Sequence, residues 1–284
     1  KERFGKKSAV LVVGPAGVRR YSNSTIAVTD IDGIPSRHAA RGGLGAVLAS
    51  KGVKAIVLAD EKADEREEYY DFTTFKKVSF EWMTKLAKSK SVLQNYGTAN
   101  LILPMNELGC LITRNFSSGS FEKANEISGE KLRKNCIERG GKLGHPCHPG
   151  CPIRCSTVYM DENGNHLTSA LEYETIGCVG SNCGIGNLDT IAKIDRFCDE
   201  YGLDTMEFGD TIGVVMESGL IEFGDEEGVL GLLEEIKKDT VLGKVLGQGT
   251  GVTGKVLGVR RIPVVKNQSL SAYDPRGLKG TGVT

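Results

Sequence analysis

Three cysteines recur every four residues within the stretch HPCHPGCPIRCST at residues 145–157: Cys147, Cys151 and Cys155. A spacing of four would place the three thiols on one face of an α-helix. However, three prolines alternate with the cysteines, and each proline inside a helix costs about 3 kcal/mol. The stretch is therefore expected to be a loop, and a loop that gathers three thiols suggests metal binding.

Thiolate ligands favour zinc or an iron–sulfur cluster. Zinc would need a fourth ligand, which His145, His148 or His166 could supply. Three cysteines in a short, proline-containing loop, with a fourth from elsewhere, are a common arrangement for a [4Fe–4S] cluster. The residues favour the cluster and leave zinc, or thiols with a purely structural or redox role, as alternatives.

Composition excludes several classes of protein. The chain has 284 residues, of which 39% are hydrophobic, and Lys plus Arg and Asp plus Glu both number 36. A net charge of zero gives no long-range attraction to nucleic acid or to an anionic membrane. No apolar run approaches the ~20 residues that a membrane span needs. The eight cysteines of this large chain are more consistent with reduced thiols than with a disulfide framework, which indicates a cytoplasmic location.

Periodicity predicts the elements that must position the cysteine loop. Short apolar runs predict strands at 8–13, 25–29, 53–58 and 156–160, and residues 44–50 are expected to form a short helix opened by glycines. Mixed charged and aromatic residues predict amphipathic helices within 60–90, and helical spacing recurs at 191–201, 205–216, 227–238 and 240–246. The fold class expected is a mixed α/β N-terminal part followed by a mainly α-helical domain.

Four stretches, in this order, resemble the tungsten-containing aldehyde:ferredoxin oxidoreductase family. They are ARGGLGAVLASKGVKAI (40–56), the cysteine loop, LEYETIGCVGSNCGIGNLDTIAKIDRFCDEYGLDT (171–205) and AYDPRGLKG (272–280). The resemblance implies that residues 1–100 are the remainder of an N-terminal α/β pterin-binding domain. Residues 101–284 would be the mainly helical cluster- and cofactor-binding domain, incomplete at its C-terminus. The absence of an initiator Met also suggests a fragment of a longer protein.

The resemblance implies a tungsten (or molybdenum) bis-pterin centre beside a [4Fe–4S] cluster. Cys147, Cys151 and Cys155 match the three cluster cysteines in the middle of the family's chain. The usual family spacing is C-x2-C-x3-C, whereas this loop reads C-x3-C-x3-C. The family's fourth cysteine lies beyond the end of this sequence.

Two further stretches match the family's pterin-binding segments. Ala40 and Arg41 align where the family holds the cofactor phosphate and its magnesium ion, and the glycines Gly42 and Gly43 offer backbone N–H groups. The motif D-x-x-G-L-D matches a loop that hydrogen-bonds one pterin, through Asp199, Gly202, Leu203 and Asp204. Gly202 is also expected to end one helix and Asp204 to cap the next.

Glu174 corresponds to a family glutamate that works as a general acid or base near the metal, a role that requires burial to raise its pKa. Glu172 is a neighbouring candidate, because alternation would put both glutamates on one side of a strand. His38 and His166 are expected to be surface or structural residues. Arg276 is expected to pair with Asp274 in a turn.

The function that follows is oxidation of aldehydes to carboxylic acids, with electrons passed to ferredoxin or a partner subunit. An aromatic-acyl reductase subunit on the same scaffold is a variant of this interpretation. The alternative is a non-catalytic zinc- or Fe–S-bearing interaction domain. A homo-oligomer is compatible with the sequence, although Ala192 and Lys193 stand where some family members hold an iron between subunits. This chain alone is expected to be inactive.

Overall fold

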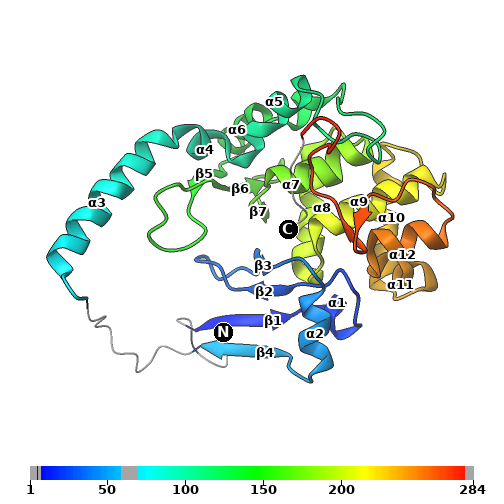
Figure 1. Cartoon of the computed structure of the whole chain (residues 1–284), viewed down its shortest axis with the longest axis horizontal. Coiled ribbons are helices and arrows are strands. Elements are labelled where there is room, and N and C mark those ends of the chain that lie inside the picture. Colours follow the sequence, from blue (N-terminus) through cyan, green and yellow to red (C-terminus); the bar gives the residue numbers. More distant parts are fainter. Residues whose placement is uncertain (1–4, 6–7, 59–68, 279–284) are drawn as a thin grey trace.

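The N-terminal part of the chain is a four-stranded antiparallel sheet with the order β3-β2-β1-β4 (Figure 1). The computed structural model describes residue 5 and residues 8–58 and 69–278. The strands are β1 (Ala9–Val13), β2 (Ile26–Val28), β3 (Arg37–Ala39) and β4 (Ala55–Leu58). The predictions at 8–13, 25–29 and 53–58 are confirmed, whereas no pattern in the sequence predicts β3.

Two short helices, α1 (Pro15–Val18) and α2 (Leu44–Ser50), pack against each other beside this sheet. A Cβ atom on Gly17 would lie 2.9 Å from the backbone of Gly45, so glycine lets the helices approach this closely. Helix α2 has the predicted bounds. The residue before it, Gly43, is its N-cap and has a φ of 70°, in the left-handed region.

The rest of the described chain is mainly helical, as predicted, and it also includes a three-stranded and a two-stranded sheet. Its helices are α3 (Phe72–Ser89), α4 (Ser91–Tyr96), α5 (Ile102–Glu107), α6 (Gly129–Glu138), α7 (Tyr173–Thr175), α8 (Leu188–Tyr201), α9 (Thr205–Glu217), α10 (Glu226–Lys237), α11 (Val241–Gly247) and α12 (Gly249–Val256). Short turns of other helix types are η1 (Thr98–Leu101), η2 (Ala124–Ile127), η3 (Ile176–Gly180) and η4 (Ser181–Cys183). The remaining strands are β5 (Lys142–His145), β6 (Ser156–Met160), β7 (His166–Ser169), β8 (Val264–Val265) and β9 (Gln268–Ser269).

Helices α8 and α9 form the centre of the hydrophobic core, and the turn between them contacts the N-terminal sheet. Helix α8 ends at Gly202, whose φ is 78°, and Asp204 caps α9 by accepting hydrogen bonds from the N–H groups of Met206 and Glu207. Both helix-end predictions are confirmed. Gly202 O accepts a hydrogen bond from Thr25 N at 2.8 Å. The turn that carries the D-x-x-G-L-D motif is thus held against strand β2.

The cysteine stretch lies between β5 and β6, in the antiparallel sheet β5-β6-β7, and the part between these strands contains no helix. The prediction of a loop is confirmed. Two side chains hold this stretch by hydrogen bonds to backbone carbonyls. Arg154 Nε donates to Gly144 O at 2.7 Å, and Gln94 Nε2 donates to Pro152 O at 3.2 Å. The His145 ring lies 3.0 Å from Asp32 Oδ2, which joins this end of the loop to the N-terminal part.

Helix α3 is the amphipathic helix expected within 60–90, whereas residues 59–68 lie outside the described part of the chain. It extends away from the other helices in Figure 1, and its apolar side chains are largely exposed, Phe80 at 72% and Trp82 at 58%. No helix among the described residues is long and apolar enough to cross a membrane.

Candidate cofactor and metal site

Arg41, in the segment between β3 and α2, is held by a buried polar network. Its Nε donates to Asp204 Oδ2 at 3.0 Å, and its Nη2 lies 3.4 Å from Glu207 Oε2. Nη2 also donates to the carbonyl and the hydroxyl of Ser269, at 2.9 and 2.7 Å. The third guanidinium nitrogen, Nη1, is buried without a hydrogen-bond partner among the described residues.

The glycines beside Arg41 have a packing role as well as the predicted binding role. A Cβ on Gly43 would lie 2.5 Å from Ser22 O, and one on Gly45 would lie 2.4 Å from Thr25 O. Gly42, by contrast, has open space where a Cβ would stand and lines a pocket of about 240 Å³ together with Asp204. Only Gly42 of these three glycines is therefore open to a ligand.

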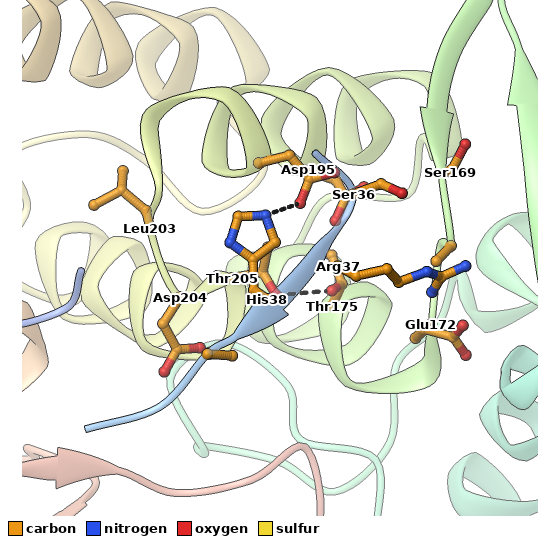
Figure 2. Close-up of a pocket in the computed structure, with 13 residues that line it drawn as sticks. Ser36, Arg37, His38, Ser169, Glu172, Thr175, Asp195, Leu203, Asp204 and Thr205 are labelled. Atoms are coloured by element: carbon orange, nitrogen blue, oxygen red, sulfur yellow. Dashed lines mark hydrogen bonds and ion pairs between the residues drawn. The ribbon is translucent and has the colours of Figure 1, made fainter. Parts of the chain in front are cut away.

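A second pocket, of about 260 Å³, lies between β3, β7 and the C-terminal end of α8 (Figure 2). The predicted residues Ala40, Asp199, Leu203 and Asp204 all line it. Four carboxylates face it, from Glu172, Asp195, Asp199 and Asp204. Asp204 lines both pockets, so the two pockets adjoin at this side chain.

Burial determines the protonation of these carboxylates. It raises the pKa of Asp204, although the nearby Arg41 guanidinium opposes the shift. Burial raises the pKa of Asp195 well above its ordinary range, and the neighbouring charge of Asp199 adds to the shift. Burial also raises the pKa of Asp199, while its hydrogen bond with His38 lowers it. Burial thus favours the protonated form of both carboxyls, and contact with His38 favours the charged form of Asp199 alone.

The two glutamates of the LEYET stretch are separated by the structure. The prediction of a strand there is wrong: Glu172 is extended, and Glu174 lies on the short helix α7. Glu172 faces the 260 Å³ pocket and accepts a hydrogen bond from the Thr98 hydroxyl, and burial raises its pKa. Glu174 Oε2 accepts from Ala272 N at 2.7 Å, and burial raises its pKa against the effect of that bond and of Arg41.

Two of the three loop cysteines come together with a histidine. The ligand atoms of Cys147, His148 and Cys151 all lie within 4.8 Å of one another. Cys155 lies outside this group and nearer the pocket, where burial and then the charge of Glu172 raise the pKa of its thiol. The loop therefore presents one mixed sulfur and nitrogen group with a third thiol beside it.

The loop and the pocket are neighbours. Arg37 on β3 lines the pocket and its Nη2 donates to the Ser156 hydroxyl at 2.7 Å, one residue after Cys155. Figure 2 shows the Arg37 side chain extended toward Glu172, and the Arg37 charge opposes the rise in the pKa of that glutamate. One side chain thus joins the polar pocket to the cysteine loop.

The remaining cysteines are not part of this site. All eight are free, and Cys178, Cys183 and Cys198 are wholly buried in the core. Burial raises the pKa of each thiol well above its ordinary value. Among the described residues, no compact group of metal-ligating side chains includes them.

Four residues of the site are not among the candidate site residues predicted from the sequence: Arg37, His38, Asp195 and Glu207. Of the two alternatives predicted for His38, surface or structural, a surface position is excluded because its side chain is only 9% exposed. His166, in contrast, is exposed, as expected. Asp195 and Glu207 did carry a signal, since each is an acidic residue on the buried face of an apolar helix.

Two family models cover most of the chain. The model described as aldehyde ferredoxin oxidoreductase, domains 2 & 3, matches residues 76–284, and the model of the N-terminal domain of that family matches residues 1–60. The N-terminal match includes Ala40 to Gly43, and the other includes the cysteine loop and the D-x-x-G-L-D motif.

Curated relatives agree with this match. The chain is 35% identical to a tungsten-containing aldehyde ferredoxin oxidoreductase of Pyrococcus horikoshii, with 100% of this chain and 48% of the relative covered. It is 24% identical to the WOR-like subunit of an aliphatic sulfonate oxidoreductase of Pyrococcus furiosus, with 92% and 42% covered. The chain thus spans about half the length of the curated relatives it matches.

A solved structure shows the same fold. The active site complex BamBC of benzoyl coenzyme A reductase, in complex with 1,5 dienoyl-CoA, superposes with a TM-score of 0.67 over 96% of this chain and 44% of that chain. The sequences are 18% identical, so this similarity concerns the fold alone.

Proposed function

Because the chain belongs to the aldehyde ferredoxin oxidoreductase family, we propose that it is part of an enzyme that oxidises aldehydes to carboxylic acids. The enzyme would carry a tungsten (or molybdenum) bis-pterin centre and a [4Fe–4S] cluster. Electrons would pass to ferredoxin or to an electron-transfer subunit in the cytoplasm. The observation that carries the proposal is the carboxylate-lined pocket, which is lined by four of the predicted pterin residues, Ala40, Asp199, Leu203 and Asp204, and adjoins the cysteine loop through Arg37.

The pocket suits a flat heterocycle with several N–H donors. Carboxylate oxygens accept hydrogen bonds from ring N–H and amino groups. Asp199 Oδ2 is buried with no hydrogen-bond partner among the described residues, so an acceptor is left for a ligand. We propose that Asp199, Gly202, Leu203 and Asp204 hold one pterin.

The cofactor phosphate and its magnesium ion would lie at the segment Ala40 to Gly43. Arg41 Nη1 is a buried donor without a partner among the described residues, and a phosphate oxygen would satisfy it. Gly42 has no atom within 4 Å of a Cβ position, which leaves its backbone accessible to a ligand. Arg41 is already paired with Asp204, so one side chain would contact both the phosphate and the pterin-binding carboxylate.

The cysteine loop suits the cluster in the chemistry of its donors. Cys147 and Cys151 are half-buried and close together, and Cys155 follows in the same loop on the side of the pocket. Three thiolates from one short loop are a common iron–sulfur donor set. We propose that these three cysteines hold the cluster and that its fourth ligand comes from outside this chain.

Oxidation of an aldehyde to an acid adds one water oxygen and releases two electrons and two protons. The bound tungsten (or molybdenum) centre would supply the two-electron chemistry. Glu174 is the group placed to hold or release a proton, because burial raises its pKa and a backbone N–H fixes one of its oxygens. Glu172 instead accepts a hydrogen bond from the Thr98 hydroxyl, and we assign it to the pocket wall.

A second function is favoured by one observation, the grouping of His148 with Cys147 and Cys151. Two thiolates and an imidazole with a further thiol nearby are also a zinc donor set. In that case the chain would be a non-catalytic interaction domain without pterin or tungsten.

The test of the proposed function uses the full-length parent protein, purified without oxygen. Addition of a small aldehyde is expected to reduce a one-electron acceptor such as ferredoxin or a viologen dye, with formation of the matching acid. The Glu174→Gln protein, which keeps the side-chain shape, is the matched control and is expected to be inactive. Absence of aldehyde-dependent reduction in protein that contains tungsten or molybdenum would contradict the assignment of substrate class.

A further inference from the structure

His38 has contacts on both sides of its ring in the wall of the 260 Å³ pocket. Its Nε2 lies 3.2 Å from Asp199 Oδ1 and 3.2 Å from Pro35 O, and its Nδ1 lies 2.7 Å from the Thr25 hydroxyl. Figure 2 shows the ring between strand β3 and helix α8, with a dashed line to a carboxylate. The ring orientation is therefore fixed by three neighbours from separate segments.

These partners determine which nitrogen carries the proton. Pro35 O and an ionised Asp199 are both acceptors, so Nε2 must be the donor. The Thr25 hydroxyl then serves Nδ1, to which it donates when the ring is neutral. Asp199 Oδ1 thus accepts a hydrogen bond from His38, and the carboxylate cannot rotate without breaking this bond.

The other oxygen of this carboxylate has no hydrogen-bond partner among the described residues. Asp199 is 8% exposed, and its Oδ2 is buried without a partner among the described residues. The other carboxylates of the pocket have donors of their own: Thr168 for Asp195, Arg41 for Asp204 and Thr98 for Glu172. Of the oxygens of these four carboxylates, Asp199 Oδ2 is the one that is both buried and without a hydrogen-bond partner within the described part of the chain.

We propose that His38 is a positioning residue for ligand recognition: it fixes Asp199 so that Oδ2 accepts a hydrogen bond from the exocyclic amino group of a bound pterin. The inference rests on the proposed function, since it takes the pocket to be a pterin site. It adds a residue that has no part in the D-x-x-G-L-D motif and reaches that motif from the N-terminal sheet. Selectivity for an amino group over a carbonyl, at the ring position that carries the exocyclic amino group, then depends on His38 of strand β3.

The test compares two free ligands by calorimetry with the full chain. Pterin carries the amino group, and lumazine has a carbonyl oxygen in its place. Wild-type protein is expected to bind pterin at least about tenfold more tightly, because a lone carboxylate oxygen attracts a donor and repels an acceptor. Asp199→Asn is expected to lose this preference, since an amide can serve either ligand.

Two variants of His38 form a matched pair. The amide nitrogen of glutamine can take the place of Nε2, whereas that of asparagine can take only the place of Nδ1. His38→Gln is therefore expected to keep the preference for pterin and His38→Asn to lose most of it, an approximately tenfold change in the affinity ratio. Thermal unfolding of both variants checks that they are folded, and a merely structural role would lower both affinities together.

The outcomes separate this inference from the proposed function. A preference unchanged in His38→Asn would overturn the role of His38 and leave the pterin site standing. A wild-type chain that binds neither ligand, or both equally, would contradict the proposal that Asp199 Oδ2 recognises the amino group of the ligand. The proposed function is decided separately, by aldehyde-dependent electron transfer and by the cofactors of the full-length protein.

Discussion

The Arg41 network offers the most quantitative test of how the site is built. The Arg41 side chain is 12% exposed, and those of its partners Asp204 and Glu207 are 6% and 7% exposed. Arg41→Met keeps the length of the side chain and removes the charge. Two buried carboxylates are then left without their cation, and breaking a buried ion pair from one side costs about 3–5 kcal/mol.

The assay is urea unfolding of the 284-residue chain at pH 7, followed by circular dichroism. Arg41→Met is expected to lose about 3–5 kcal/mol of unfolding free energy. Lys134→Met, which removes an exposed pair with Glu138, is the matched control and is expected to lose less than about 0.5 kcal/mol. The double variant Arg41→Met/Asp204→Asn is expected to recover part of the lost unfolding free energy. It removes one of the two carboxylates left without a cation, and Asn can still cap α9. A loss below about 1 kcal/mol in Arg41→Met would refute the reasoning, since it would mean that these carboxylates do not depend on Arg41.

Three further predictions concern protonation, iron and turnover. Asp210 is wholly buried, and burial raises its pKa well above the ordinary value. A carboxylate with a raised folded-state pKa stabilises the fold fully below its unfolded-state pKa, and this contribution is lost as pH rises through the folded-state value. Asp210→Asn, which keeps the acceptor for Asn182 Nδ2, is therefore expected to be more stable than wild type at pH 8 and to show a smaller decrease in unfolding free energy between pH 5 and 8. An equal decrease in both proteins would contradict this, since it would show that Asp210 has already lost its proton below pH 5 in the folded protein. Cys151→Ser and Cys155→Ser are each expected to lose most of the iron that the protein takes up on anaerobic reconstitution. The control Cys110→Ala, which changes a buried cysteine outside the loop, is expected to keep it. The measurement is iron content, and equal iron in all three variants would exclude the loop as the cluster site. In the full-length enzyme, Glu174→Gln is expected to lower kcat by about 100-fold or more while the pterin content stays unchanged. Glu172→Gln is expected instead to lower the pterin content. The reverse result would assign proton transfer to Glu172 and the pocket wall to Glu174.

The elements that carry apolar periodicity could be predicted from the sequence. Helix α2 and strand β6 have the predicted bounds, and both ends of the Gly202 turn follow from local rules for helix caps. The cysteine loop follows from its prolines, because no tertiary contact can restore the donors that proline lacks.

The parts that could not be predicted depend on contacts between distant segments. Strand β3 has no β pattern of its own, and its pairing with β2 is what brings His38 to α8. Glu172 and Glu174 alternate as in a strand, yet the chain turns into helix α7, where Ala272 N binds Glu174. Arg41 Nη1 and Asp199 Oδ2, which are buried without hydrogen-bond partners among the described residues, likewise arise only when the pocket is folded. The assignments of individual residues to cofactor, cluster and catalysis, and the domain boundary near residue 100, stay predictions.

The measurement that tests the central claim most directly is the metal and pterin content of the full-length protein, purified without oxygen. We expect tungsten or molybdenum together with pterin and about four irons per chain. Zinc alone, without pterin, would contradict it and would make the cysteine loop a structural zinc site.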